Sequence, residues 1–351
     1  PHHQTLQNLS QGNFVNFAFL NGRRIFITGG TGFVGSHLLP LLADAGASVT
    51  VLVRPTSDIS HLPPSVKTVP VSLTDSAGLS EAIRGSDTVI HMAALLFGLG
   101  WQDYLSANAR AAASLAEACS RLGKDGPRRF IHVSSLSSAG PCCTEEGVSE
   151  ADAGLPVSAY GWSKRLAENI LRASLGDRLV IVRPPIIYGS GDRGMLPVYK
   201  GLQKGLAVLP GLSGKFPVSA MHVRDVAQAI MLCCQDRASG VYHLNDGRVY
   251  SMKDIYLAAS KAIGRKPRIL RLPLWFMGLT AVLCTAAGYA ARKLGAKRAP
   301  NWNIDKFREA RQCGWTGSSA RISSELGFEP SVDLDEGMRE TMAGNHRMGL
   351  L

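Results

Sequence analysis

The sequence predicts an α/β protein with a doubly wound parallel sheet, because apolar strand patterns alternate with helical patterns over its first half. We expect strands over residues 24–28, 48–53, 66–71, 88–91, 129–133 and 179–182. Helical patterns lie between them, over residues 33–44, 76–84, 103–122 and 158–174. This alternation gives right-handed βαβ units with helices on both faces of the sheet, so a ligand is expected at the carboxyl ends of the strands.

A glycine-rich turn joins the first strand to the first helix. Gly29, Gly32 and Gly35 stand between the apolar run 24–28 and the helical pattern that begins at residue 33. Glycine accepts unusual backbone dihedrals and lets phosphate oxygens approach main-chain N–H groups, and the helix start adds a positive dipole end. We therefore expect a dinucleotide pyrophosphate at this turn of a Rossmann fold.

A tyrosine and a lysine lie one helical turn apart in the fourth helical pattern. Tyr160 and Lys164 therefore share one face of that helix. A free phenol has a pKa near 10, and a neighbouring ammonium favours its ionised form. We expect Tyr160 to act as an acid/base whose pKa Lys164 lowers.

Composition restricts the class of partner. The 351 residues include 38 basic and 27 acidic side chains, for a net charge of +11, which favours an anionic partner such as a nucleotide or a lipid surface. The basic residues form no block with interleaved aromatics, so we expect no nucleic acid. The seven cysteines have no spacing typical of a metal or redox site, so we expect no metal and reduced thiols in the cytoplasm.

The strand and helix rhythm changes after residue 185, where glycine and proline become frequent. We expect residues 22–185 to form the dinucleotide-binding domain, joined by a helix and a strand within about 221–244. Residues 186–220 and 245–351 would form a smaller, discontinuous substrate lobe. Residues 1–21 lack periodicity and are interpreted as a flexible segment or tag remnant, although residues 14–20 could also pack onto the surface.

One long stretch has no charged residue. Residues 272–291 are long enough to span a membrane, but Pro273, Gly278 and Gly288 dilute their apolar character. We expect a helix pair that lies on a membrane surface or covers the substrate, with the protein peripheral to the inner face of that membrane. The alternatives for the same stretch are a membrane span, helices that simply pack on the lobe, and an interface within a homodimer.

Six motifs follow one another along the chain: the TGxxGxxG turn at 28–35, His91-Met-Ala-Ala94, Asn108, Val133-Ser-Ser135, Tyr160-x-x-x-Lys164 and Arg183-Pro-Pro-Ile-Ile-Tyr-Gly189. In this order they give the chain a resemblance to the extended short-chain dehydrogenase/reductases of the NAD-dependent epimerase/dehydratase family. The resemblance implies hydride transfer between a nicotinamide and a substrate carbon, with a proton moving to or from the attached oxygen.

The resemblance also implies roles for residues at the matching positions. The implied catalytic residues are Ser135, Tyr160, Lys164 and Asn108, with Ser134 as the alternative to Ser135. His91 is expected to be structural. The implied cofactor-binding residues are Gly29, Thr31, Gly32, Phe33, Val34, Gly35, Arg54, Leu73, Ala93, Ala94, Tyr160, Lys164, Pro184, Ile186 and Ile187.

The end of the second strand bears on cofactor preference. NAD sites often place an acid there to bind the ribose hydroxyls, but this chain has Val53 and then Arg54. Arginine pairs with a 2′-phosphate, which an acid would repel. We expect NADP(H), held by Arg54 with help from Thr56 or Ser57, and NAD(H) is the alternative. Leu73 and the residue before it replace an acid that the family often carries after the third strand.

The expected reaction is the interconversion of a hydroxyl and a ketone on a small, lipophilic, sterol-like molecule. By resemblance, the acids of nucleotide-sugar dehydratases would stand at positions 136 and 137, where this chain has Leu136 and Ser137, so dehydration is disfavoured. One alternative is a nucleotide-sugar epimerase that retains its cofactor. It would use the basic residues Arg193, Lys200, Lys204 and Arg224. The other alternative is a non-catalytic NADP-binding regulator.

Overall fold

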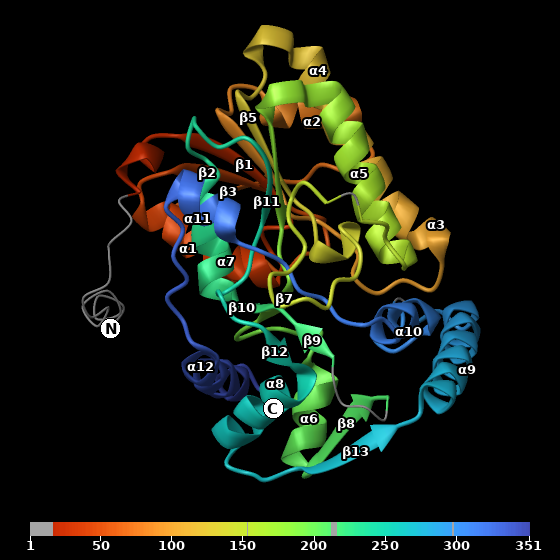
Figure 1. The fold of residues 1–351 in the computed structure, drawn as a ribbon. Helices are drawn as coiled ribbons and strands as arrows, with labels where there is room; N and C mark the ends of the chain where they lie inside the picture. The colour runs from red at the N-terminus through yellow and green to blue at the C-terminus, as the bar shows by residue number, and fades with distance from the viewer. Residues whose placement is uncertain (1–16, 153, 212–215, 297) are drawn as a thin grey trace.

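The computed structural model describes residues 17–152, 154–211, 216–296 and 298–351, and its described part contains one central sheet of seven strands (Figure 1). The strand order is β11-β6-β5-β4-β1-β2-β3, and every neighbouring pair is parallel. The strands are β1 (Arg24–Thr28), β2 (Ser48–Leu52), β3 (Lys67–Val69), β4 (Thr88–His91), β5 (Arg129–Val133), β6 (Leu179–Arg183) and β11 (Gly240–His243). The expected fold class is confirmed, and the strand order reverses between β1 and β4, where ligands bind in such sheets.

Helices cover both faces of the sheet because side chains alternate along each strand. Ile25 and Ile27 pack with one set of helices, and Phe26 packs with the other. The first set is α1 (Phe33–Asp44), α7 (Val223–Leu232) and α11 (Ala320–Leu326), and the second is α2 (Ser76–Ile83), α4 (Ala111–Leu122) and α5 (Ala159–Leu175). The expected return of a helix and a strand to the sheet corresponds to α7 and β11.

The helix expected over residues 103–122 is interrupted. It begins as α3 (Trp101–Tyr104), passes through a π-helical turn over Leu105–Arg110, and continues as α4. A π turn inserts an extra residue and rotates the following side chains, and such turns are frequent at functional sites. Asn108 lies within this turn and is 1% exposed.

The N-terminal segment expected over residues 1–21 lies mostly outside the described residues. Its described end is packed: Ala18–Leu20 forms a short 3-10 helix, and Leu20 is fully buried in the core that α1 shares with the sheet. Leu20 therefore belongs to the folded core rather than to a flexible segment.

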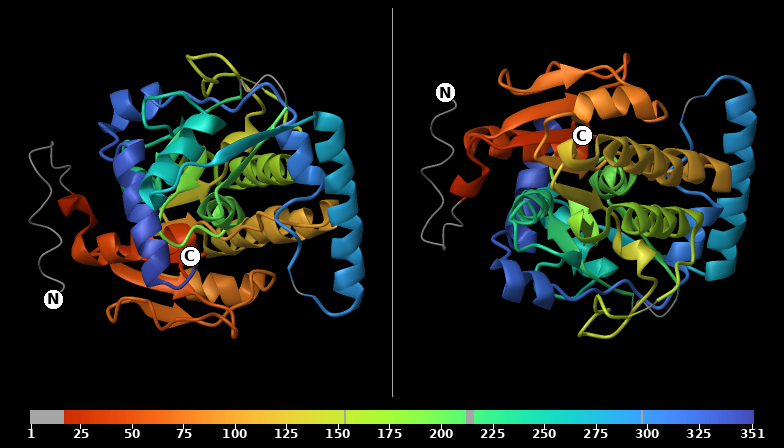
Figure 2. Two further views of the ribbon diagram at one scale, coloured as in Figure 1. Left: turned by 90° about the horizontal axis from the view of Figure 1, so that it is seen from below. Right: turned by 90° about the horizontal axis from the view of Figure 1, so that it is seen from above.

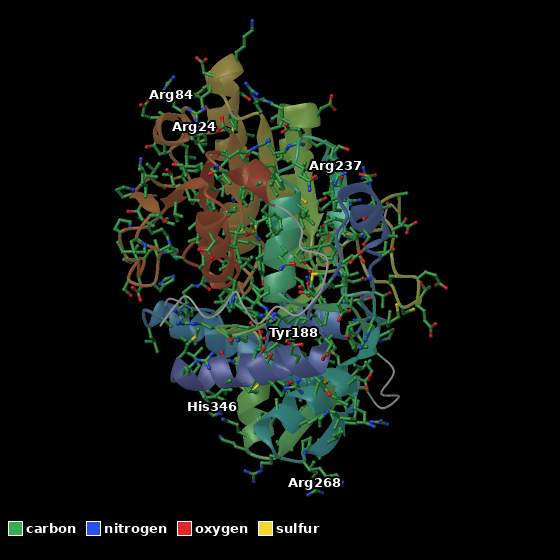
Figure 3. The ribbon with its side chains drawn as sticks, turned by 90° about the vertical axis from the view of Figure 1, so that its left-hand side faces the viewer. Arg24, Arg84, Tyr188, Arg237, Arg268 and His346 are labelled. Carbon is green, nitrogen blue, oxygen red and sulfur yellow. The ribbon has the colours of Figure 1, made fainter. Side chains whose placement is uncertain are left out.

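The remaining elements lie below the carboxyl edge of the sheet in Figure 1 and share a core of their own. They include β7 (Ile186–Tyr188), α6 (Leu196–Gln203), β8 (Leu206–Pro210), β9 (Pro217–Val218), β10 (Ala220–His222), β12 (Tyr250–Ser251), α8 (Met252–Ile263), β13 (Arg268–Leu272) and α12 (Leu334–Arg347). Figure 3 shows Tyr188 between the upper and lower parts of the molecule. Its buried ring packs edge-on against His222.

The uncharged stretch 272–291 is one continuous helix, α9 (Leu274–Lys293), rather than the expected helix pair. Pro273 directly precedes the helix, and Arg292 and Lys293 in its last turn interact favourably with the negative end of the helix dipole. The residues between these two ends form one uninterrupted helix. α9 lies along one flank of the molecule, beside the shorter α10 (Ile304–Ala310) (Figure 2). By length and composition α9 could cross a membrane, and 17% of its most apolar window is buried.

Candidate active site

The glycine turn after β1 is packed so closely that side chains would not fit. Gly29 has a φ of +79°, and a Cβ there would lie 2.6 Å from the backbone N of Ala93, two residues after β4. A Cβ on Gly35 would lie 2.2 Å from the carbonyl oxygen of Gly30. The turn therefore needs glycine for its backbone conformation at one end and for contact with α1 at the other.

The first turn of α1 is open to an anion. Gly32 is its N-cap residue, and no described side chain caps the helix there. The first turn also contains no acid, and Thr31, Phe33 and Val34 are partly exposed. The main-chain N–H groups at this positive end of the helix donate to no capping side chain among the described residues, and such groups bind a pyrophosphate well. These residues therefore fit the dinucleotide that the sequence predicts.

Arg54 stands two residues after β2, the strand next to β1 in the sheet. Its side chain is exposed and makes no ion pair with any residue that the structure describes. The Ser57 hydroxyl accepts a hydrogen bond from the Arg54 backbone N–H at 3.1 Å, and the Ser57 N–H donates to the Arg54 carbonyl at 2.9 Å. These two hydrogen bonds fix the backbone of the turn over 54–57, and they leave the Arg54 guanidinium exposed near the carboxyl end of β2.

The other expected cofactor residues follow the ends of other strands. Leu73 comes after β3 and is partly buried, while Ala94 follows β4 and is exposed. Pro184 is buried directly after β6, and its carbonyl accepts the Leu136 N–H at 2.9 Å. Ile186 and Ile187 continue into β7.

Tyr160 lies in the first turn of α5, which Ser158 caps by accepting the Gly161 N–H. The residue is 8% exposed. Burial raises the pKa of Tyr160 above its ordinary value, and the Ser135 hydroxyl opposes this rise because it can donate a hydrogen bond to the phenol oxygen. The sequence argument had Lys164 lower the pKa of the phenol, but in this structure the loss of water around the ring has the larger effect.

Lys164 is 1% exposed, and its ammonium donates a hydrogen bond to the Val133 carbonyl, at the end of β5, at 2.8 Å. Burial lowers the pKa of Lys164 to about 8, against an opposing effect of Glu168. The lysine therefore joins α5 to the end of β5, beside the tyrosine but directed at the backbone.

A buried charge network distinguishes the two adjacent serines. Ser134 donates to the Glu168 carboxylate at 2.5 Å, and Arg183 pairs with the same carboxylate. Ser138 adds a third donor at 2.6 Å. The Ser134 hydroxyl is thus bonded to a buried carboxylate, whereas the Ser135 hydroxyl lies within reach of the phenol of Tyr160.

Asn108 connects two segments of the site. Its side-chain oxygen accepts the Leu95 N–H at 2.8 Å, and its side-chain nitrogen donates to the Ser163 hydroxyl at 2.8 Å. Ser163 directly precedes Lys164, so Asn108 ties the loop after β4 to the catalytic face of α5. The ring of His91 forms a hydrogen bond with the Thr28 hydroxyl at 2.7 Å. Burial lowers the pKa of His91 to about 3.

Helix α10 brings three residues to the site that sequence reasoning missed. Asp305 accepts the backbone N–H groups of Ala159 and Tyr160, and Glu309 accepts the hydroxyl of Ser158. The ammonium of Lys306 lies 4.5 Å from the centroid of the Tyr160 ring. These contacts join residues about 145 positions apart, and no local pattern in the sequence indicates them.

The amino-acid sequence is similar to a known protein family and to several characterised enzymes. The sequence profile described as the NAD dependent epimerase/dehydratase family matches residues 25–247. The chain is 32% identical over 324 residues to a ceramide reductase of Caulobacter vibrioides, with 91% of this chain and 93% of the relative covered. It is 27% identical over 341 residues to a decarboxylating sterol-4-alpha-carboxylate 3-dehydrogenase of Dictyostelium discoideum, covering 91% of this chain and 99% of the relative.

A solved structure shows the same fold. The Bordetella bronchiseptica enzyme WbmG, determined in complex with NAD, superposes with a TM-score of 0.73 at 20% identity. The superposition covers 94% of this chain and 96% of that chain.

Proposed function

The chain belongs to the NAD dependent epimerase/dehydratase family, and within it we propose an NADP(H)-dependent oxidoreductase that interconverts a hydroxyl and a ketone on a lipophilic molecule. The observation that carries this proposal is the cluster of Tyr160, Ser135 and Lys164 at the carboxyl edge of the sheet, beside the open glycine turn. A phenol, a hydroxyl and a buried ammonium in this arrangement serve proton transfer at a substrate oxygen.

The bound nicotinamide dinucleotide supplies or accepts the hydride. Tyr160 exchanges a proton with the substrate oxygen, and Ser135, within hydrogen-bonding reach of the phenol, orients that oxygen. Lys164 holds α5 against the end of β5 and contributes a positive charge beside the phenol. The buried pair of Glu168 and Arg183 keeps the serine turn in place.

The cofactor is a nicotinamide dinucleotide, and we propose a preference for its 2′-phosphorylated form. Arg54 supports this preference, since its guanidinium is exposed at the end of β2 and is unpaired among the described residues. Val53 stands where an acid would bind the ribose hydroxyls of NAD.

A lipophilic substrate is supported by the surroundings of α9. An apolar cavity of about 390 Å³ lies between α9, α10 and the β8–β13 pair, lined by residues that include Phe216, Met277 and Trp302. α10 contributes Ala310 to this cavity and Lys306 to the Tyr160 ring, so one helix connects the cavity with the catalytic tyrosine. The names of the two relatives, a ceramide reductase and a sterol carboxylate dehydrogenase, agree with a lipid substrate.

We further propose that α9 rests on an anionic membrane at the cytoplasmic side. Trp275 is 72% exposed and Leu283 is 59% exposed, on the face of α9 that points away from the body. Arg268, before the helix, and Lys293, at its end, are exposed cations that suit acidic headgroups, and Figure 3 shows Arg268 at the outer end of the lower part. A second copy of the chain on the same face would instead give a homodimer.

The function is tested with purified protein by titrating NADPH and NADH and then assaying lipid ketones, ketosteroids and UDP-sugars for cofactor turnover. We expect tighter binding of NADPH and turnover with a lipid ketone or alcohol. Tyr160→Phe should abolish turnover while leaving NADPH affinity within a few fold of wild type. Activity on UDP-sugars without net cofactor oxidation would instead support the epimerase, and unaltered turnover in Tyr160→Phe would refute the proton transfer.

A further inference from the structure

Helix α10 places a second ammonium group at the catalytic phenol. We propose that Lys306 is a positioning residue that favours the ionised form of Tyr160, and that Glu309 limits this effect. The inference rests on the proposed role of Tyr160 as acid/base. It assigns to α10, a helix that lies almost 150 residues beyond the tyrosine in sequence, the control of the pH at which the enzyme works.

The position of Lys306 suits this role. Its ammonium lies 4.5 Å from the centroid of the Tyr160 ring and 5.5 Å from that of Phe97. It pairs with Glu309 at 2.9 Å, and both side chains are 15% exposed. Little water therefore screens the ammonium, so its field acts strongly on a charge that develops on the neighbouring phenol.

The backbone around Tyr160 fixes this arrangement. Asp305, next to Lys306 in α10, accepts the N–H of Ala159 at 2.6 Å and that of Tyr160 at 3.1 Å. It therefore satisfies the first two N–H groups of α5, the helix that carries the tyrosine. Glu309 accepts the Ser158 hydroxyl at 2.7 Å, one turn further along α10. Lys306 lies between these two anchors, so its distance from the phenol is set by hydrogen bonds on both sides.

Other charged or titratable groups around the phenol come from α3 and α5. Lys164, on α5, donates to a backbone carbonyl, and Glu168 of the same helix is paired with Arg183. Tyr104, on α3, contacts the Tyr160 ring edge-on at 6.1 Å, and burial raises its pKa, so it is uncharged at neutral pH. Lys306 and Glu309 are therefore an oppositely charged pair whose two members act on Tyr160 in opposite directions.

The test is the pH dependence of kcat/KM in variants of the full chain. Whichever direction the reaction runs, ionisation of Tyr160 produces one limb of the profile. Lys306→Met keeps the length of the side chain and should move this limb to higher pH by about one to two pH units. Lys306→Arg should restore the limb, and Glu309→Gln, whose amide oxygen still accepts from Ser158, should move it to lower pH.

Arg308→Met is the matched control, because Arg308 is an exposed cation on the same helix. It should leave the limb where it is. A limb that does not move in Lys306→Met, or that moves in the same direction in Lys306→Met and Glu309→Gln, overturns the inference. If instead Tyr160→Phe retains turnover, the proposed function fails and not the effect of Lys306.

A measurement without turnover separates electrostatics from misfolding. A fluorinated tyrosine placed at position 160 titrates at lower pH than tyrosine, and its ionisation can be followed by absorbance in the cofactor-free protein. Adding Lys306→Met should raise the pKa of that phenol, whereas Arg308→Met should not change it. Equal pKa values in the two variants would contradict the proposal even if both variants fold.

Discussion

Replacing Arg183 by Met should destabilise this protein more than any exposed charge change. The Arg183 and Glu168 side chains are 3% and 0% exposed, and they pair beneath the serine turn. The substitution keeps much of the volume of the side chain but leaves a carboxylate in the interior with only hydroxyl donors, Ser134 and Ser138, among its described partners. Breaking a buried pair from one side costs about 3–5 kcal/mol in the free energy of unfolding.

The pH dependence of this loss has a definite sign. In the wild type, burial raises the pKa of Glu168, but hydrogen bonds and charge from Arg183 outweigh it, so the net pKa is lowered. Its contribution to stability is present above the unfolded pKa of about 4.3 and is lost as pH falls through the lower folded value. Without Arg183, burial dominates and raises the folded pKa, so the deficit is largest at neutral pH and shrinks as the carboxyl protonates.

Urea denaturation of Arg183→Met, Glu168→Gln and the double variant at pH 7.5 and pH 5 measures these effects. The double variant should recover part of the loss, because the neutral amide of Gln still accepts from Ser134 and has no buried charge. A deficit below about 1 kcal/mol at pH 7.5, or an equal deficit at both pH values, would refute the reasoning.

Three further changes have expected outcomes. Arg54→Asp should lower kcat/KM for NADPH at least about tenfold and raise the relative use of NADH; an unaltered ratio would contradict the NADP(H) preference. Burial lowers the pKa of His132, so stability should fall as pH drops below about 6.5, and His132→Leu should flatten that fall in urea midpoints. Trp275→Ser with Leu283→Ser should reduce flotation with anionic liposomes, and equal flotation would argue against membrane docking through α9.

The sheet could be predicted from sequence because its strands are buried runs with clear ends. The expected strands over 24–28, 88–91 and 129–133 coincide with β1, β4 and β5. The π turn at Leu105–Arg110 could not be predicted, since a helical apolar pattern looks the same with one extra residue inserted. The two-residue strands β9 and β12 are too short for any period to show.

In the candidate site, too, some residues are placed by spacing along the chain and others by tertiary packing. The glycine turn and the spacing of Tyr160 and Lys164 are local, so their placement follows from chain geometry. Glu168 could have been found by the same reasoning, because it lies one turn beyond Lys164 on the buried face of α5. Asp305 and Lys306 reach the tyrosine only through tertiary packing, which no spacing along the chain records.

The choice between Ser134 and Ser135 shows what the fold adds to a motif. The two hydroxyls are chemically identical, and in the sequence only the resemblance separates them. In the structure, Glu168 accepts the Ser134 hydroxyl into a buried network, whereas the hydroxyl of Ser135, just beyond β5, accepts the Ser137 N–H and lies within reach of Tyr160. A residue on a different element, 34 positions away, therefore decides which serine is held in the interior and which keeps its O–H donor for the catalytic face.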